Sequence, residues 1–257
     1  MLGYVFPLTF GNVARTICTM KYIDAHCHLV SGADMAAAAN AGVVGRVINA
    51  ACEDDWAAVV NMTDAARGVY VALGIHPWYV ADAVPGWDAR LRDILVRRPD
   101  LMVGETGLDK NRGDISPQAD FLRTHLRIAA DLHRVVHIHS VGAWGALTDV
   151  LRDAPRAPAV VMHAFSGSVE MMRELARYNA YFSFGGLVLD SNRHGLADVV
   201  AHVDAHCILV ETDAPDSGFP AADLARVVER IAAIRGVGPD EMAEIIYQNS
   251  KRMLHNG

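Results

Sequence analysis

Short apolar runs alternate with stretches of helical periodicity along the chain from Lys21 onward. The apolar runs have the length of strands, and the stretches between them repeat apolar residues at the spacing of helices with one buried face. Strands are predicted at residues 22–26, 45–52, 68–77, 101–107, 135–140, 158–165, 180–186 and 207–215. Strands that alternate with helices indicate a parallel sheet, and eight repeats predict an α/β chain closed into a TIM-like (β/α)8 barrel.

The helices are expected from about Asp34 and then at residues 53–67, 87–98, 116–133, 144–154, 168–179, 195–204, 221–236 and 239–254. Ser116 is predicted to cap its helix, with Pro117 at the first helical position. The alternation of predicted strands and helices is not interrupted by a linker or a low-complexity tract, so we expect residues 20–257 to form one domain.

The first 19 residues fit this pattern poorly. They lack a basic start and a small-residue cleavage site, and Pro7 and Gly11 interrupt them, so a signal peptide is not expected. We expect residues 1–19 to be a disordered or loosely attached extension, or an upstream mis-start, with Met20 as the true first residue.

Composition narrows the class of protein. Hydrophobic residues make up 52% of the 257 positions, but no apolar run reaches the roughly 18 residues of a membrane helix. The net charge of −7 argues against broad electrostatic binding of nucleic acid, while it leaves room for an acidic site that recruits cations. The four cysteines show no C-x-x-C spacing and no secreted disulfide framework, which favours reduced thiols in a cytoplasmic protein. A monomer is expected because nothing in the sequence demands an apolar interface.

Residues that can bind metal fall at the ends of the predicted strands. The stretch YIDAHCHL has two histidines two positions apart, and this pair alone fits a histidine-bearing strand as well as a metal site. A parallel barrel, however, collects the carboxyl ends of its strands at one mouth. The residues expected there are His26, His28, His76, Glu105, His139, His163 and Asp213.

Four of these imidazoles with two carboxylates form a mixed nitrogen and oxygen donor set, which suits Zn, Mn or a related divalent ion. The set is larger than one ion needs and is about right for two, with Glu105 as a possible bridge. Asp213 can bind an ion and also accept a proton from water. Asp24 is expected on the same strand face, one layer below the histidines.

The other polar residues receive structural interpretations. His76 is predicted to contact substrate rather than metal, and His137 to pack in the core. Surface or capping roles are expected for the remaining histidines, namely His125, His133, His194, His202, His206 and His255. Asp109 is expected to organise its loop or support a ligand, and Glu211 to be structural.

Six motifs in order, DAHCHL, GIHP, VGETGLD, HIHS, HAFSGS and ETDAP, resemble the TatD family of metal-dependent hydrolases, and the late YQNSKRML resembles that family's closing helix. The resemblance spans residues 22–254. It implies a deoxyribonuclease of the amidohydrolase group with two divalent metal ions (Mg, Mn or Zn). One ion would be held by His26, His28, Glu105 and Asp213, and the other by Glu105, His139 and His163. His76 would approach a phosphate oxygen of the substrate.

Three departures from the family pattern concern the substrate. Val141 replaces a basic contact after strand five. The acidic and apolar segment DSGFPAADLARV replaces an arginine-containing loop after strand eight. After the glutamate motif, GLDKNRG stands in place of the common aromatic residue. Lys110 and Arg112, together with Arg193, can compensate as substrate-binding cations.

Three functions are compatible with these residues. The first is a phosphodiesterase or deoxyribonuclease that uses metal-activated water on a nucleic-acid or phosphoester substrate. The second is a hydrolase for a small amide, lactone or phosphoester, because barrel loops change substrate without changing the fold. The third is a non-catalytic metal-binding scaffold.

Overall fold

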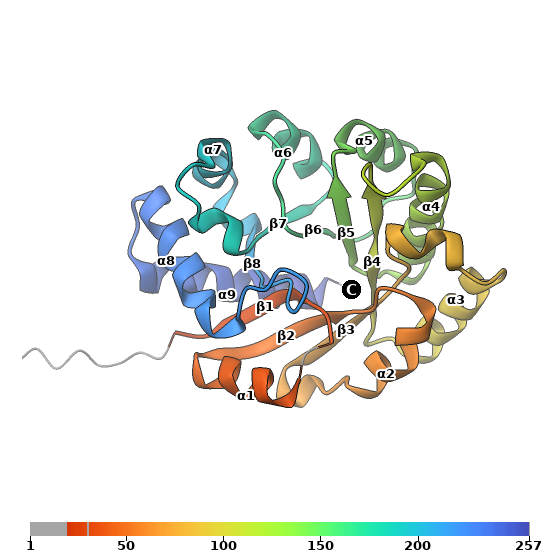
Figure 1. The fold of residues 1–257 in the computed structure, drawn as a ribbon, viewed down its shortest axis with the longest axis horizontal. Coiled ribbons are helices and arrows are strands. Elements are labelled where there is room, and N and C mark those ends of the chain that lie inside the picture. Colours follow the sequence, from red (N-terminus) through yellow and green to blue (C-terminus); the bar gives the residue numbers. More distant parts are fainter. Residues whose placement is uncertain (1–19, 30, 257) are drawn as a thin grey trace, which may run out of the picture.

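Eight parallel strands form one sheet in the order β1 to β8 (Figure 1). The computed structural model describes residues 20–29 and 31–256. The strands are β1 Tyr22–Cys27, β2 Val43–Asn49, β3 Val69–Leu73, β4 Met102–Asp109, β5 Val136–Val141, β6 Val160–Met162, β7 Ala180–Phe184 and β8 Ile208–Val210. The predicted (β/α)8 barrel is thereby confirmed.

Within the described residues, helices α1 to α8 surround the strands in chain order, and α9 packs on β1, β8 and α8 (Figure 1). They are α1 Gly32–Asn40, α2 Trp56–Asn61, α3 Trp87–Arg97, α4 Ile115–Leu132, α5 Trp144–Asp153, α6 Val169–Ala176, α7 His194–His202, α8 Leu224–Arg235 and α9 Pro239–His255. Across residues 20–29 and 31–256, the helices include none long and apolar enough to cross a membrane.

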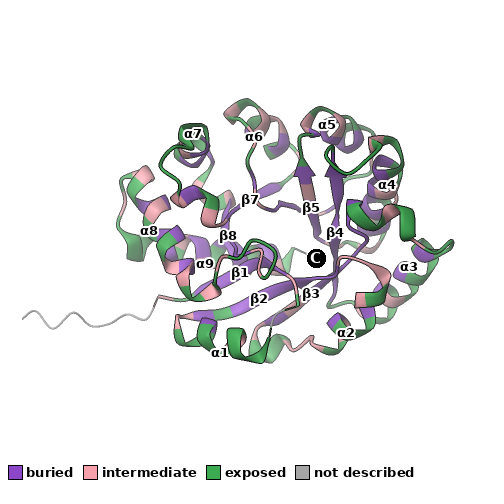
Figure 2. Cartoon of the chain, in the orientation of Figure 1, coloured by how far each residue is buried: buried purple, intermediate pink, exposed green. Residues whose placement is uncertain are grey.

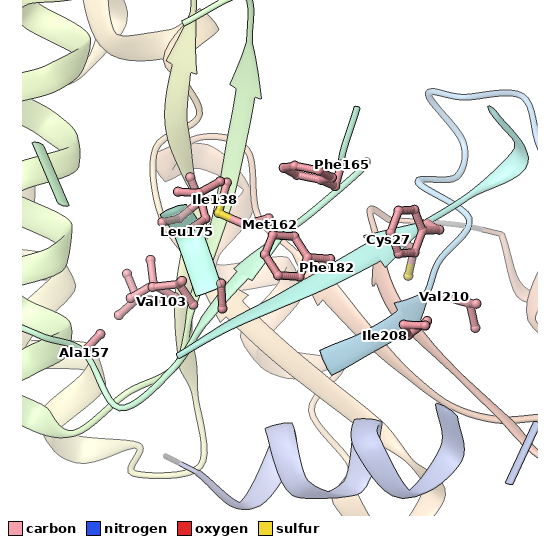
Figure 3. Close-up of a cluster of buried hydrophobic side chains, with 14 of the residues drawn as sticks. Cys27, Val103, Ile138, Ala157, Met162, Phe165, Leu175, Phe182, Ile208 and Val210 are labelled. Carbon is pink, nitrogen blue, oxygen red and sulfur yellow. The ribbon is translucent and has the colours of Figure 1, made fainter. Parts of the chain in front are cut away.

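The main hydrophobic core lies between the strands and the surrounding helices. The strands are buried, and the helices expose their outer faces (Figure 2). Ile138, Met162 and Phe182 are register partners on β5, β6 and β7, and their side chains gather in this layer with Leu175 of α6 (Figure 3). Because strand side chains alternate, an outward Ile138 turns His137 and His139 into the barrel. Packing of ordinary apolar residues therefore directs the histidines inward.

Strands β1 and β8 close the barrel through contacts just beyond β8. The Asp213 N–H donates to the His26 carbonyl (2.9 Å), and the His28 N–H donates to the Ala214 carbonyl (2.8 Å). Below them, the buried Asp24 carboxylate accepts hydrogen bonds from the N–H and Oγ1 of Thr212 (2.9 and 2.6 Å). The first and last strands of the barrel are therefore joined beside residues that were predicted as metal ligands.

Two expectations about the helices need correction, and one about the first residues falls outside the described part of the chain. Asp114, not Ser116, caps α4, because its carboxylate accepts the Ser116 N–H at 2.9 Å. The helix expected at 53–67 ends at Asn61, and Asp64 caps a separate 3-10 turn that closes at Gly68 in a left-handed conformation. Residues 1–19 lie outside the described residues, so the proposed extension stays a prediction.

Candidate metal centre

The seven predicted residues come together in the half of the barrel that holds the carboxyl ends of the strands. His28 directly follows β1, His163 directly follows β6, and Asp213 lies three residues beyond β8. Glu105 was expected at the end of its strand, and this is wrong. Strand β4 continues to Asp109 because Thr106–Asp109 stay paired with β5. Glu105 consequently lies inside the barrel with only 1% of its surface exposed.

One glycine allows β4 and β5 to approach closely beside the site. Gly107 pairs with His139 and has a φ of 151°. A Cβ at this position would lie 2.0 Å from the His139 carbonyl oxygen. The GETG sequence therefore has two roles: it supplies Glu105, and its second glycine, Gly107, lets β5 with His139 pack closely against β4.

The two carboxylate oxygens of Glu105 face two different groups of imidazoles. Oε2 lies 3.2 Å from His26 Nε2 and 3.4 Å from His28 Nε2. The other oxygen, Oε1, lies 3.1 Å from His139 Nδ1 and 2.9 Å from His163 Nε2. Asp213 belongs to the first group, because its Oδ1 lies 3.8 Å from His26 Nε2 and 3.6 Å from His28 Nε2.

Binding of divalent ions explains the close approach of these side-chain atoms better than direct hydrogen bonds between them do. Although the atoms are close, neither Glu105 oxygen accepts a hydrogen bond of acceptable geometry within the described chain, and both are buried. With ligands about 2.1 Å from an ion, neighbouring ligand atoms lie about 3.0 Å apart at right angles and about 3.4 Å apart in a tetrahedron. The observed separations of 2.9–3.8 Å cover this range. The residues present therefore fit metal binding.

The proton positions on two histidines indicate different roles. His28 Nδ1 lies 3.0 Å from the Asn49 carbonyl oxygen, so Nδ1 carries a proton, and Nε2 is the nitrogen that faces Glu105 and Asp213 and would bind a metal. His76 shows the opposite arrangement, because its Nδ1 accepts the Trp78 N–H at 3.2 Å. Burial lowers the pKa of His76, which keeps it neutral with its proton on Nε2. His76 thus presents a donor to the site.

Two further carboxylates lie behind the second group of histidines. Glu211 is fully buried, accepts the Ala164 N–H at 2.6 Å and lies 3.5 Å from His163 Nδ1. Asp109 lies 3.6 Å from His139 Nε2 and accepts the Trp78 indole N–H at 2.7 Å. Carboxylates in these positions fix the imidazole ring and its tautomer.

The acidic groups of the site are held in their ionised form. Burial alone would raise the pKa of Glu105, but the charge of the neighbouring imidazoles, His163 foremost, lowers it well below its usual range. Burial likewise raises the pKa of Asp213, and its hydrogen bond with His28 and the charge of His163 outweigh that effect and lower it. Ionised carboxylates are the form that binds a metal.

Asp24 was expected on the strand face of the histidines, one layer below them, but it does not share their face. The pairing of β1 with β2 shifts register between Asp24 and Cys27, which breaks the strict alternation of faces. Asp24 instead bonds Thr212 at the seam with β8, and burial raises its pKa to about 7 against the effect of those bonds. Its support of the site is indirect, through closure of the barrel.

The remaining histidines fall into two groups. His137 is fully buried and its ring centroid lies 5.8 Å from that of His26, as expected for a core residue one layer below the site. The expectation of a surface role for His125 is wrong, because it is fully buried, accepts the Ile75 N–H at 3.2 Å and stacks on Trp87. The others are exposed, namely His133, His194, His202, His206 and His255.

A cavity of about 220 Å³ opens above Glu105, and we call it the central cavity. Its walls are formed by His28, Ala51, His76, Trp78, Tyr79, Glu105, His139, His163, Asp213, Asp216 and Ser217. Lys110 and Arg112 are both exposed after β4. The Arg112 guanidinium stacks 4.0 Å above the Trp78 ring, whereas Arg193 lies 3.8 Å from Asp190. Sequence reasoning missed Trp78 and Tyr79, although both directly follow the GIHP strand end.

A (β/α)8 barrel whose mouth gathers imidazoles around a buried carboxylate is an arrangement suited to a metal-dependent hydrolase. The family model described as TatD related DNase matches residues 23–255. The chain belongs to this family of metal-dependent hydrolases, as its motifs indicated.

Individual relatives agree with this assignment. The chain is 31% identical over 257 residues to YjjV of Escherichia coli K12, an uncharacterized metal-dependent hydrolase, with 91% of this chain and 98% of the relative covered. It is also 31% identical over 201 residues to the 3'-5' ssDNA/RNA exonuclease TatD of Citrobacter koseri, covering 70% of this chain and 76% of that protein. The crystal structure of YjjV superimposes with a TM-score of 0.84 and covers 91% of this chain and 98% of its own.

Proposed function

We propose that this protein is a phosphodiesterase that uses two divalent metal ions to cleave a nucleic-acid strand, most simply as a deoxyribonuclease. The observation that carries the proposal is the division of Glu105, whose two oxygens face separate sets of imidazoles. His26, His28 and Asp213 would hold one ion, and His139 and His163 the other, with Glu105 shared. The name of the Citrobacter relative supports a nucleic-acid substrate.

When bound, Mg, Mn or Zn would supply Lewis acidity that lowers the pKa of water and stabilises charge on phosphate oxygens. Asp213 is the residue placed to accept the proton from the attacking water, because its side chain is 25% exposed and faces the central cavity. Its pKa lies below the usual range, so the carboxylate is ionised before the proton arrives.

The substrate would be oriented by residues around the central cavity. His76 Nε2 lies 3.3 Å from Glu105 Oε1 at the wall of the central cavity, and its N–H is suited to donate to a phosphate oxygen bound there. Arg112 is held over Trp78, which is itself fixed by Asp109, so its charge is positioned beside the cavity. Lys110 adds a second cation after β4. These roles follow the predicted substrate-binding set.

One observation favours a second candidate, hydrolysis of a small neutral ester, lactone or amide. The loop after β8 brings Asp216 within 4.0 Å of His28 Nε2, where the family pattern has an arginine-containing loop. A negative charge at this edge opposes binding of a polyanion, and it would not oppose a neutral substrate.

An activity panel separates the two candidates. The purified protein, stripped of metal and reloaded with Mg, Mn or Zn, would be offered single-stranded DNA, bis-p-nitrophenyl phosphate and a set of lactones and amides. We expect cleavage of the phosphodiesters, a loss of at least 100-fold in Asp213→Asn, and no change in Asp198→Asn, which is exposed on α7. Turnover of only lactones or amides would establish the second candidate instead.

A further inference from the structure

An apolar pocket adjoins the central cavity on the side of β6, β7 and β8. It has a volume of about 440 Å³ and includes the side chains of Phe165, Phe184, Leu187, Leu196 and Phe219. Asp213 and Ser217 line both spaces, so the apolar pocket begins where the proposed catalytic carboxylate stands. A substrate bound over Glu105 would therefore place one of its own neighbouring groups against the apolar walls of this pocket.

The wall of the apolar pocket has a defined local structure. Phe219 is held by its N–H, which donates to Ser217 Oγ at 3.0 Å, while Ser217 Oγ donates to the Thr212 carbonyl at 2.6 Å. The Phe219 ring rests on Gly186, where a Cβ would lie 2.8 Å from ring carbon Cδ2. The segment after β7 and the loop after β8 can approach this closely because Gly186 has no side chain.

Leu187 completes this wall without serving the core. Its side chain is 45% exposed, whereas its neighbour Val188 is buried. An exposed leucine beside a pocket of aromatic rings offers an apolar surface to a ligand.

Charge is distributed unequally along the resulting cleft. Lys110 and Arg112 follow β4 and lie by Trp78, at the end away from the apolar pocket. The apolar pocket itself has only Glu211 and Asp213 as charged lining residues. Phosphate groups are accordingly favoured at the β4 end and disfavoured in the pocket.

We propose that the apolar pocket receives the base of the nucleoside attached to the scissile phosphate. This inference rests on the proposed phosphodiesterase function and assigns the pocket as its specificity site. A nucleobase is a flat ring system that stacks on aromatic side chains without needing a cationic partner. The volume of the pocket is ample for one base, so the enzyme binds one unpaired nucleotide beside the metals.

The test uses two single-stranded oligonucleotides that differ only at the 3′-terminal nucleotide, thymidine in one and an abasic tetrahydrofuran residue in the other. Their phosphates are the same, so metal binding and catalysis affect both equally. We expect the wild-type protein to favour the base-bearing strand by about 10-fold in kcat/KM, as loss of one stacked base predicts. In Leu187→Asp and in Phe219→Ala this preference should fall to about 2-fold or less, mainly through KM for the base-bearing strand.

Val96→Asp serves as the matched control, because Val96 is 60% exposed on the outer helix α3. It should retain the full preference. Equal cleavage of the two strands by wild-type protein would overturn the inference and leave the phosphodiesterase function intact. The same conclusion would follow if both pocket variants kept the wild-type preference for the base-bearing strand. Failure to cleave either strand or bis-p-nitrophenyl phosphate would refute the proposed function and the inference together.

Discussion

Glu211 offers a sharp test of how the metal centre is built, because it touches a proposed ligand without belonging to the ligand set. Its Oε1 accepts the Ala164 N–H at 2.6 Å and lies 3.5 Å from His163 Nδ1. An ionised partner favours the tautomer with the proton on Nδ1, which leaves Nε2 free to face Glu105. Glu211→Gln keeps the shape and one acceptor oxygen but removes the charge, and its amide can donate to Nδ1 and favour the opposite tautomer.

The expected loss can be estimated from such carboxylate–histidine pairs, whose removal typically costs about 10- to 100-fold in metal affinity. This corresponds to about 1.4–2.7 kcal/mol of binding free energy. The loss should fall on the ion held by His139 and His163, with little change at the other. Titration of metal-free protein with Mn²⁺ by calorimetry would resolve the two affinities.

Two controls separate this effect from misfolding. Glu229→Gln alters an exposed glutamate on α8 and should bind both ions normally. The free energy of unfolding of metal-free Glu211→Gln should stay within about 1 kcal/mol of wild type, because the Ala164 hydrogen bond is kept. Two unaltered ion affinities in Glu211→Gln would refute the reasoning that Glu211 orients His163.

Three other measurements address the fold and the substrate. Thr212→Val should lower the free energy of unfolding by about 1–3 kcal/mol in urea denaturation, because Asp24 loses its 2.6 Å partner, whereas Thr212→Ser should be near neutral. Burial lowers the pKa of His125 to about 4, so below pH 6.5 the unfolded chain binds a proton that the folded protein excludes. Wild-type stability should therefore fall between pH 7 and pH 4 by about 3 kcal/mol more than that of His125→Phe, and equal pH profiles would contradict this. If Lys110 and Arg112 supply the main phosphate contacts, a plot of log kcat/KM on single-stranded DNA against log salt concentration should have a slope of about −1.4. The slope should be about 0.7 shallower in Arg112→Gln. A wild-type slope steeper than about −3 would show that a wider basic surface binds the strand.

The positions of the proposed metal ligands could be predicted from the sequence because they follow a simple regularity. Polar residues such as His28 and His163 directly follow apolar strands, and a closed parallel barrel brings strand ends together wherever they lie in the chain. The inward direction of His139 also follows from alternation with the outward Ile138. The fold and the convergence of these side chains therefore needed no long-range information beyond closure.

Other features depend on contacts that periodicity does not encode. The register shift in β1 that separates Asp24 from the histidines is set by pairing with β2. Burial of His125 depends on Trp87 and Ile75, which are 38 and 50 residues away in the sequence. The apolar pocket joins Phe219 to Gly186 through a close approach that appears only in three dimensions.

The seam between β1 and β8 has a consequence for synthesis of the protein in the cell. His26 and His28 are among the first residues of the barrel to be made, whereas their partner Asp213 is made 185 residues after His28. At about 5–20 residues per second, the ribosome adds this interval in about 10–40 s. During that time the nascent chain lacks both the last carboxylate and the hydrogen bonds that close the barrel around it. The complete donor set can therefore form only after residue 213 has been made, when all eight strands of the barrel have been synthesised.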